Sequence, residues 1–406
     1  MSFRLSCYFL VFSILFISCS GNNDNEIGVD TTIPVDTFID LNEKVITAKK
    51  EWLDDIFSRL HKRRGFIGTV LYAEKGEVIY HKAFGFADLR NRDSLKINSS
   101  FQLASVSKMF TATAIMILKQ SGKIDYDLDI RNYLTDFPYE GITIRMLLTH
   151  RSGLSRYMTL AHEQWKDKTI PFTNKAMYQL FIKHKPSTYA KPDQLFHYCN
   201  TNYALLANIV EEISGQPFNS FIDQHIFEPL KMNNSFVYHM NKDESVSAYI
   251  SEGVPGYRYS GWRPIRQRNE YLNGVMGDKG VYSSVEDLFK FDHALNNGLL
   301  LNDTILQEAF KGGSPKSRRR KDNYGFGWRI RGSQDSTVYH YGWWKGFRAF
   351  YIRDMKQEKT ILVLSNRAKG PGSTPLWSII NTMKNPIGKA CLIEEDQFTT
   401  SLNPTP

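Results

Sequence analysis

The spacing of hydrophobic residues changes several times along the chain, and each change predicts a different element. A first segment has apolar side chains at helical spacing, which predicts an α-helix over residues 45–61 with Val45, Trp52, Ile56 and Leu60 on one face. The next segment, GFIGTVLYAEKGEVIYHKAFGFADL, contains two runs rich in β-branched and aromatic residues. These runs are joined by Glu74-Lys75-Gly76-Glu77, so we expect a β-hairpin there.

Longer helical patterns dominate the middle of the chain, and strand patterns return near its end. A helix is predicted from about Ser105 to a C-cap at Ser121-Gly122, and NYALLANIVEEISG (202–215) predicts another. The segment GDKGVYSSVEDLFKFDHAL predicts a further helix. Three strand-like runs follow, STVYHYGW, FRAFYIRD and TILVLSN, and then a last helix.

This order of elements predicts an α+β fold of the α/β sandwich type. Strands near both ends of the chain would form one antiparallel sheet flanked by helices, and the mostly helical middle would form an all-α insertion. We expect the α/β part to span about 41–104 and 275–390, and the helical part about 105–274. Together they would form one domain over residues 41–395.

The composition fits a globular protein and gives no sign of nucleic-acid binding. Of the 406 residues, 42% are hydrophobic, which is enough for a sizeable core, and the formal net charge is +9. The densest basic run, Lys316–Lys321, follows GGSP and has neither interleaved aromatic residues nor a reading helix beside it. We therefore interpret this run as a solvated surface loop and expect no nucleic-acid partner.

The first residues have the pattern of an export signal. Residues 1–18 contain one early Arg and an apolar run of about twelve residues, which has the length of a signal-peptide core and is short for a membrane span. Phe16-Ile17-Ser18-Cys19 resembles a bacterial lipobox, which predicts cleavage before Cys19 and a lipid on its thiol. Residues 19–40 would then be a flexible tether. The alternative is a plain cleaved signal and a secreted or periplasmic protein.

The spacing of cysteine and histidine predicts no metal site. The sequence has four Cys and contains neither CxxC nor HExxH. If Cys7 leaves with the signal and Cys19 carries lipid, Cys199 and Cys391 remain. A disulfide between them is conceivable, but two buried free thiols are the favoured interpretation.

The helix predicted from Ser105 begins with a Ser-x-x-Lys motif. Residues three apart lie on one face of a helix, so Ser105 Oγ and Lys108 Nζ can meet. A poorly solvated lysine is able to act as a base toward serine, and a backbone N–H at a helix start is free to stabilise an oxyanion. The flanking FQLAS is apolar, in keeping with such a site. Chains of this length also contain Ser-x-x-Lys by chance, so an ordinary core helix stays open.

A second motif is Tyr198-Cys199-Asn200. A tyrosine hydroxyl beside a lysine is a candidate base or proton relay, and an asparagine two residues on is able to hydrogen-bond both the lysine and a substrate amide. Taken singly, the motif is better explained as a loop whose aromatic ring packs while Asn200 caps the following helix.

A third motif is His340-Tyr341-Gly342. Glycine on a strand permits a ligand to approach the backbone closely, and the next N–H, from Trp343, would face the same ligand. Taken singly, this motif is better explained as an exposed histidine on an aromatic-rich strand.

The order Ser-x-x-Lys, Tyr-x-Asn and basic residue-x-Gly, across a two-part architecture, resembles the serine β-lactamase-like family. That family includes class C β-lactamases, penicillin-binding D-alanyl-D-alanine carboxypeptidases, D-aminopeptidases and related esterases. The resemblance covers about residues 65–370 and includes the segments ITIRMLLTHRSGLS, FHYCNTNYALLANIVEEISGQPF, GDKGVYSSVEDLFKF and YGFGW.

The resemblance implies catalytic roles for three of these residues. Ser105 would be the nucleophile, Lys108 its neighbouring amine, and Tyr198 a phenolic base or proton relay to the leaving group. The reaction would be acyl transfer through an acyl-serine ester. The resemblance implies no metal and no organic cofactor.

The resemblance also implies a substrate-binding role for four residues. Asn200 would orient Lys108 and the substrate amide, and the N–H of Trp343 would form the oxyanion hole with that of Ser105. His340 and Gly342 would belong to the strand that lies along the substrate.

His340 stands where β-lactamases of the family usually carry the lysine of Lys-Thr-Gly. A lysine is a permanent cation suited to a carboxylate, whereas histidine is largely neutral at pH 7. Lys345 and Arg348, just downstream, would be candidate cations in its place. The substitution favours a peptidase, amidase or esterase over a dedicated β-lactamase.

We therefore expect a D-alanyl peptidase, amidase or esterase acting on a small molecule or short peptide, with peptidoglycan fragments as candidates. A β-lactamase with broad or weak activity is the alternative among enzymes. A catalytically inactive penicillin- or peptidoglycan-binding lipoprotein is the alternative outside them. The expected location is the bacterial cell envelope, where the protein would face the periplasm or the cell surface and touch the membrane through its lipid anchor only.

Overall fold

The computed structural model describes residues 43–240, 250, 252–315, 322–332 and 336–368. The signal peptide, the lipidated Cys19, the tether, the basic run Lys316–Lys321, the last helix and Cys391 lie outside these residues and stay predictions. Among the helices that the structure describes, none combines the length and the apolar character needed to cross a membrane.

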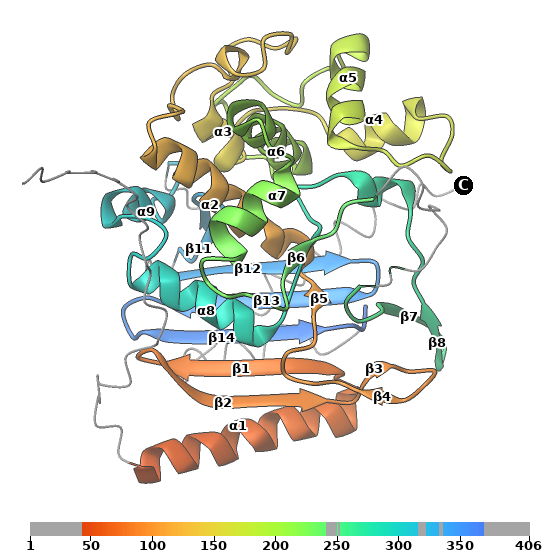
Figure 1. The fold of residues 1–406 in the computed structure, drawn as a ribbon, viewed down its shortest axis with the longest axis vertical. Helices are drawn as coiled ribbons and strands as arrows, with labels where there is room; N and C mark the ends of the chain where they lie inside the picture. Colours follow the sequence, from red (N-terminus) through yellow and green to blue (C-terminus); the bar gives the residue numbers. More distant parts are fainter. Residues whose placement is uncertain (1–42, 241–249, 251, 316–321, 333–335, 369–406) are drawn as a thin grey trace, which may run out of the picture. The chain divides into compact units, whose positions relative to one another are not determined.

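A seven-stranded antiparallel sheet organises the fold (Figure 1). Its strand order is β10-β11-β12-β13-β14-β1-β2, so β1, an early strand of the chain, pairs directly with β14, a late one. The predicted antiparallel sheet built from both ends of the chain is thereby confirmed. Its strands are β1 (Gly68–Glu74), β2 (Glu77–Phe84), β10 (Asn323–Tyr324), β11 (Arg329–Ile330), β12 (Thr337–Trp344), β13 (Phe347–Asp354) and β14 (Lys359–Ser365).

Two tight turns set the register of this sheet. Lys75 and Gly76 connect β1 to β2, and both have positive φ angles, 53° and 79°. Lys345 and Gly346 connect β12 to β13 in the same way, with φ angles of 40° and 91°. Two-residue turns with positive φ at both positions match the twist of antiparallel strands. The hairpin predicted at residues 74–77 is confirmed.

The two faces of the sheet are covered by different layers. Successive side chains of a strand point to opposite faces, and in β1 Val70 belongs to one hydrophobic cluster while Leu71 belongs to the other. Helix α1 (Glu43–Arg64) covers the first face through Leu53 and Phe57. The predicted helix is confirmed, but Trp52 is not on its buried face: the indole is 41% exposed, because Leu53 and Phe57, one turn apart, define that face.

The other face carries the larger core and the insertion. Helices α2 (Ser107–Gln120) and α8 (Val285–Asn296) contribute buried residues to this core. Helix α2 lies between the sheet and the helices of the insertion (Figure 1). The helices of the insertion are α3 (Ile144–Leu148), α4 (Tyr157–Gln164), α5 (Asn174–His184), α6 (Asn200–Ser214) and α7 (Phe218–Ile222); α9 (Asp303–Ala309) follows α8. The predicted helix over 202–215 is therefore confirmed as α6, which ends at Gly215 in the left-handed conformation.

The insertion is mostly helical but not all-α. Strand β6 (Phe236–Val237) pairs with β9 (Val281–Ser283), which also pairs with β5 (Phe101–Gln102), and β7 (Tyr257–Ser260) forms a hairpin with β8 (Arg263–Arg266). These strands are short, and only four residues long at most, which is why the sequence pattern did not reveal them. Two further short strands, β3 (Phe86–Asp88) and β4 (Asp93–Ser94), pair with each other after β2.

Candidate active site

Ser105 lies in a single turn of 3-10 helix, η1 (Ala104–Val106), immediately before α2. The sequence places it at the start of the α-helix, and the difference is one turn. Ala104 has a φ of 49°, in the left-handed region that non-glycine residues seldom adopt. Strain of this kind persists only where the surrounding structure enforces it, and it is concentrated at functional sites.

Strand β12 holds η1 in this conformation. A Cβ atom added to Gly342 would lie 2.1 Å from the carbonyl oxygen of Leu103 and 3.0 Å from Ala104 Cβ. The space that the absent side chain of Gly342 leaves is thus taken by the chain's own backbone next to Ser105. Gly342 was predicted to admit a ligand, and the structure shows that it admits η1.

Lys108 is brought to Ser105 as the motif predicts. Its Nζ lies 3.2 Å from Ser105 Oγ and donates a hydrogen bond to the main-chain oxygen of Asp278 at 2.7 Å. The side chain is fully buried. Nζ also lies over the rings of Tyr198, at 5.2 Å from the centroid, and Tyr203, at 5.6 Å. A buried amine beside a hydroxyl is the arrangement expected of a base and its nucleophile.

Tyr198 is the second predicted residue at this site, and it is half-buried. Its ring packs against His150 (centroids 4.3 Å apart) and His340 (6.2 Å), and the guanidinium of Arg329 lies 5.2 Å from its centroid. Two cationic side chains, Lys108 and Arg329, therefore face the ring of Tyr198.

Asn200 is the first residue of α6 and does not contact Lys108 by any hydrogen bond in the described structure. Its Oδ1 is buried, and within the described residues it has no hydrogen-bond partner. A buried amide oxygen without a partner is uncommon and calls for an explanation, such as a ligand that supplies the donor.

His340 is buried and its ring makes two hydrogen bonds. Nδ1 lies 2.8 Å from the main-chain oxygen of Tyr341, and Nε2 lies 3.0 Å from the hydroxyl of Tyr324. A carbonyl oxygen only accepts, so Nδ1 carries the proton and Nε2 accepts from Tyr324. Burial, together with the charges of Arg329 and Lys108, holds the pKa of His340 well below its usual value. The ring is thus neutral at pH 7, and it is not the exposed strand histidine of the simpler interpretation.

The backbone N–H of Trp343 is directed toward the side of β12 on which β11 pairs. Arg331 N donates to Thr337 O at 3.0 Å across β11 and β12, so odd-numbered residues of β12 direct their backbone groups to this edge. The register between β11 and β12 ends at Tyr339. Trp343 follows in the continuous β12–β13 register and directs its N–H to the same edge, on the part of the strand that lies against η1.

Three functional candidates were missed from sequence: His150, Arg329 and Asp278. His150 accepts from the backbone N–H of Cys199 at 3.2 Å and so fixes the loop that carries Tyr198. Its pKa is held well below the usual value by burial and by the charges of Lys108 and Arg329. His150 lies in the family-like segment ITIRMLLTHRSGLS and Asp278 in GDKGVYSSVEDLFKF, and Arg329 follows YGFGW directly. The resemblance alone assigned no role to these three residues. All three reach the site through contacts between distant segments.

The two cations that the sequence suggested in place of lysine have other partners. Lys345 forms an ion pair with Glu270 at 2.5 Å, and Arg348 Nε donates to the main-chain oxygen of Ala368 at 2.7 Å. Cys199 is buried, and its thiol lies 3.5 Å from the main-chain oxygen of Ser155. Within the described part of the chain, no group of His, Cys, Asp or Glu is arranged to hold a metal ion.

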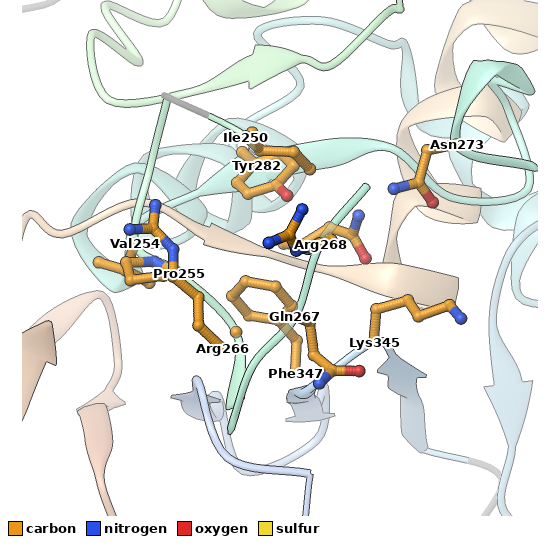
Figure 2. A pocket seen from close by; sticks show the side chains of 12 residues that line it. Ile250, Val254, Pro255, Arg266, Gln267, Arg268, Asn273, Tyr282, Lys345 and Phe347 are labelled. Atoms are coloured by element: carbon orange, nitrogen blue, oxygen red, sulfur yellow. The ribbon is translucent and has the colours of Figure 1, made fainter. Parts of the chain in front are cut away.

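A small pocket lies beside the β12–β13 turn (Figure 2). Lys345 and Phe347 line it from the turn and Gln102 lines it from β5. Ser105 and Lys108 are not among its lining residues, so this cavity is not the space in front of the nucleophile. The other lining residues are Ile250, Val254, Pro255, Gly256, Arg266, Gln267, Arg268, Asn273 and Tyr282.

Comparisons with known proteins agree with this geometry. A family model described as "Beta-lactamase" matches residues 53–379. "Penicillin-binding protein 4*" of Bacillus subtilis (strain 168) is 36% identical over 330 residues, which cover 79% of this chain and 72% of that protein. The "D-aminopeptidase" of Brucella anthropi is 27% identical over 231 residues, which cover 56% of this chain and 42% of that protein. The crystal structure of a penicillin binding protein from Bacillus halodurans superposes with a TM-score of 0.69 at 26% identity, covering 80% of this chain and 98% of that one.

Proposed function

The chain belongs to the Beta-lactamase family of serine hydrolases, and from this we propose that it cleaves small D-amino-acid amides or esters, D-alanyl peptides among them, through an acyl-serine intermediate. The observation that carries the proposal is the 3.2 Å contact between Ser105 Oγ and the buried Nζ of Lys108. The D-aminopeptidase among its relatives supports the substrate class.

In the proposed acylation, Ser105 Oγ attacks the carbonyl carbon of the substrate while Lys108, as a neutral amine, takes the hydroxyl proton. The negative charge that develops on the carbonyl oxygen is stabilised by the N–H groups of Ser105 and Trp343. When the tetrahedral intermediate collapses, the bond to the leaving group breaks and Tyr198 passes a proton to the departing amine or alcohol.

Deacylation reverses these roles. Lys108 first returns the proton that it took from Ser105 to Tyr198, which gave its own proton to the leaving group. Water then attacks the acyl ester and its proton passes to Lys108. When the bond between the acyl group and Ser105 Oγ breaks, Ser105 Oγ leaves with this proton, which restores the free enzyme and releases a carboxylic acid. Asn200 Oδ1, which has no hydrogen-bond partner within the described residues, would accept an N–H from the substrate amide. These steps use side chains and backbone groups of this chain throughout.

The neutral state of His340 supports a peptidase, amidase or esterase rather than a dedicated β-lactamase. At the position where the family usually has a lysine, this protein has a buried ring whose two nitrogens are both engaged by Tyr324 and Tyr341. Such a ring offers no permanent cation to a substrate carboxylate.

The test is covalent labelling followed by mass spectrometry of the intact protein. A fluorophosphonate, a labelled penicillin, D-Ala-D-Ala peptides and short esters would be offered to the wild type and to Ser105→Ala. We expect a mass gain in the wild type that names the acyl group, and none in Ser105→Ala. Because Ser105 lies in a short turn, the variant should unfold at the same denaturant concentration as the wild type. Folded wild-type protein that no reagent labels would contradict hydrolysis and favour a binding lipoprotein.

We also propose that the protein is an envelope lipoprotein anchored through Cys19. Support comes from the signal-like residues 1–18, the lipobox-like tetrad before the tether, and bacterial relatives named as penicillin-binding proteins. Expression with a labelled fatty acid should label the wild type and not Cys19→Ser. Equal labelling of both proteins would contradict the anchor.

A further inference from the structure

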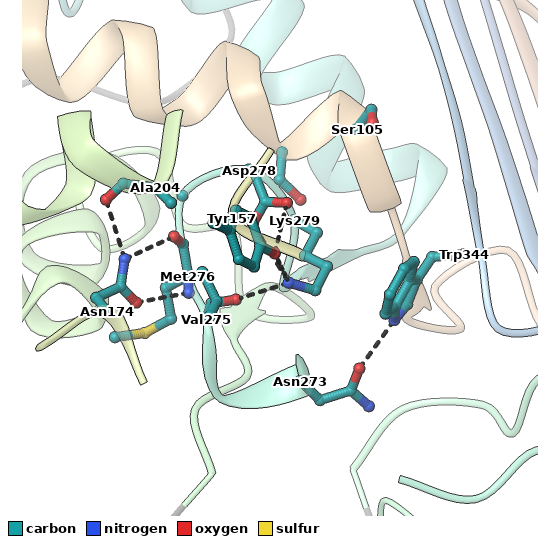
Figure 3. A network of polar contacts seen from close by, with 12 residues as sticks. Ser105, Tyr157, Asn174, Ala204, Asn273, Val275, Met276, Asp278, Lys279 and Trp344 are labelled. Atoms are coloured by element: carbon teal, nitrogen blue, oxygen red, sulfur yellow. Dashed lines mark hydrogen bonds and ion pairs between the residues drawn. The ribbon is translucent and has the colours of Figure 1, made fainter. Parts of the chain in front are cut away.

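We propose that the buried ion pair of Asp278 and Lys279 is a positioning device that keeps Lys108 able to act as a base. The inference rests on the proposed function and assigns a role to the segment GDKG, which the proposed mechanism leaves unused. In this role the pair holds the main-chain oxygen that binds Lys108, and Lys279 balances the charge of the Asp278 carboxylate, which Figure 3 shows beside it.

The segment 277–281 is fastened along α2 by three hydrogen bonds. Thr111 Oγ1 donates to Gly277 O at 2.7 Å, and Val281 N donates to Ser107 Oγ at 3.0 Å. Between these two attachments, Asp278 O accepts from Lys108 Nζ at 2.7 Å. The carbonyl that orients the amine therefore depends on where residue 278 is held.

The carboxylate of Asp278 is held by a closed set of contacts. Tyr157, the first residue of α4, donates its hydroxyl proton to Asp278 Oδ2 at 3.1 Å. Lys279 Nζ donates to Tyr157 Oη at 2.8 Å, to Val275 O at 3.2 Å and to Asp278 Oδ1 at 3.3 Å. Three acceptors satisfy the three N–H bonds of an ammonium, so the geometry fits a charged lysine paired with a charged aspartate.

The pair is almost fully buried, so its charges interact with that of Lys108 across a poorly solvated region. The side chains of Lys279 and Asp278 are 4% and 1% exposed. Burial lowers the pKa of Lys279, the carboxylate of Asp278 opposes this effect, and the charge of Lys108 lowers it further. The two lysines therefore influence each other electrostatically through the buried site.

Lys279 also reaches the strand that carries the oxyanion donor. Its Nζ lies 5.2 Å from the ring centroid of Trp344, whose Nε1 donates to Asn273 Oδ1 at 2.9 Å. Figure 3 shows Lys279 beside the Tyr157 ring and below Asp278, with the Trp344 indole and Asn273 on its other side. Trp344 is the neighbour of Trp343, so one buried ammonium braces both the Lys108 side and the Trp343 side of the site.

Within the described part of the chain, the other titratable groups that face Lys108 are two tyrosines and two histidines. Tyr198 and Tyr203 present their rings to Nζ. His150 and His340 are held neutral by burial and by nearby positive charges. The carboxylate of Asp278 is thus the acidic group on the residue that binds Lys108, and Lys279 balances its charge.

The experiment measures the rate of Ser105 acylation as a function of pH in Lys279→Met. Methionine keeps the length of the side chain but leaves the carboxylate of Asp278 unpaired, and this negative charge stabilises the ammonium form of Lys108. We expect the acid limb of the acylation profile to move upward by about one pH unit or more, with recovery of the rate at high pH. The double variant Asp278→Asn/Lys279→Met removes both charges and should return the limb to its wild-type position.

Two further variants separate this role from a structural one. Arg353→Met breaks a second buried pair, that of Arg353 and Asp292 (2.7 Å; side chains 4% and 3% exposed), and should lower stability without moving the acid limb. If Lys279→Met does not fold, Tyr157→Phe removes one donor from the same carboxylate and should move the limb in the same direction by less.

The outcomes distinguish the positioning role of the Asp278–Lys279 pair from the proposed function. An acid limb that stays in place in folded Lys279→Met, or in Tyr157→Phe when Lys279→Met does not fold, would overturn the positioning role alone and leave Ser105 as the nucleophile. A limb that moves equally in Arg353→Met would also overturn it, because the shift would then reflect destabilisation. Wild-type protein that is never acylated would overturn the proposed function and this inference together.

Discussion

The two faces of the central sheet are built on different principles. Against α1, the sheet buries an apolar cluster in which Phe57 lies 5.9 Å from Phe66 and 6.2 Å from Tyr80 between ring centroids. On the other face, between β12 and α2, the buried groups include Lys108 and His340. Apolar burial stabilises a fold directly, whereas a buried amine costs free energy unless it is satisfied. The first face thus stabilises the fold through apolar packing, whereas the second also buries polar groups that serve the proposed reaction.

The sharpest way to break this comparison is to replace the buried amine. Lys108→Met should reduce acylation of Ser105 by at least about a thousandfold, because the base and its hydrogen bond to Asp278 O are both lost. Its free energy of unfolding should be equal to or higher than that of the wild type, since a buried polar group leaves an apolar site. Labelling rates and urea unfolding measure the two effects. A variant that is both inactive and strongly destabilised would show that Lys108 is structural.

The converse change lies on the α1 face. Phe57→Ala should lower the free energy of unfolding by about 3–5 kcal/mol, because it opens a cavity among well-packed aromatic rings. The fraction that remains folded should be acylated at the wild-type rate. Urea unfolding and labelling of the folded fraction are the measurements. Exposed Trp52→Ala, in the same helix, is the matched control and should change stability little. Loss of labelling in folded Phe57→Ala would contradict the separation of the two faces.

A change at the contact between β12 and η1 should lower both the stability of the protein and its rate of acylation. Gly342→Ala would place a methyl group 2.1 Å from Leu103 O, so the strand and the turn must move apart. We expect a loss of about 1–3 kcal/mol in stability and at least a tenfold slower acylation. Gly76→Ala is the control, because its surroundings are open and the cost is limited to the left-handed backbone. Unchanged acylation in Gly342→Ala would mean that the contact does not position Ser105.

The smallest expected effect concerns pH. His150 and His340 have depressed pKa values in the folded protein, so they stay neutral while their unfolded forms, with a pKa of about 6.5, take up protons as the pH falls. Their contribution to stability is therefore present above about pH 6.5 and is lost below it, at up to about 1.4 kcal/mol per pH unit for each ring. Urea unfolding from pH 7.5 to 5.5 measures the slope.

Two variants sharpen this pH prediction. His340→Gln should reduce the slope, because one of the two buried rings no longer titrates, although its overall stability will differ from that of the wild type. His162→Gln, at an exposed position, should leave the slope unchanged. An equal slope in wild type and His340→Gln would show that the buried ring does not control the acid sensitivity.

Local signals in the sequence were sufficient for the sheet but not for the site. The β1–β2 hairpin follows from Lys75-Gly76 between two strand-like runs, and α6 follows from its periodicity and Gly215. Trp52 was predicted on the buried face of its helix, but Leu53 and Phe57 define that face and the indole is 41% exposed. The left-handed Ala104 is enforced by β12, which comes more than 200 residues later in the chain.

The same reason explains why three residues near the candidate nucleophile were not predicted from the sequence. Ser105 and Lys108 are close in sequence, so their contact follows from helical spacing alone. His150, Arg329 and Asp278 reach the site from three other segments, and their sequence contexts carry no spacing rule that links them to Ser105. Only the tertiary structure shows that His340 is buried and bonded to Tyr324 instead of exposed on its strand.

The pairing of β1 with β14 determines how late during synthesis the central sheet is completed. Gly68 pairs with Ser365, so a ribosome produces Ser105 and Lys108 long before β12 and β14 exist. Until then the nucleophile has no Trp343 N–H beside it, and β1 has an unpaired edge of the kind that recruits chaperones or aggregates. Pairing over such sequence distances also slows folding. If the chain is exported unfolded, as the proposed anchor at Cys19 requires, its site would be completed only after export.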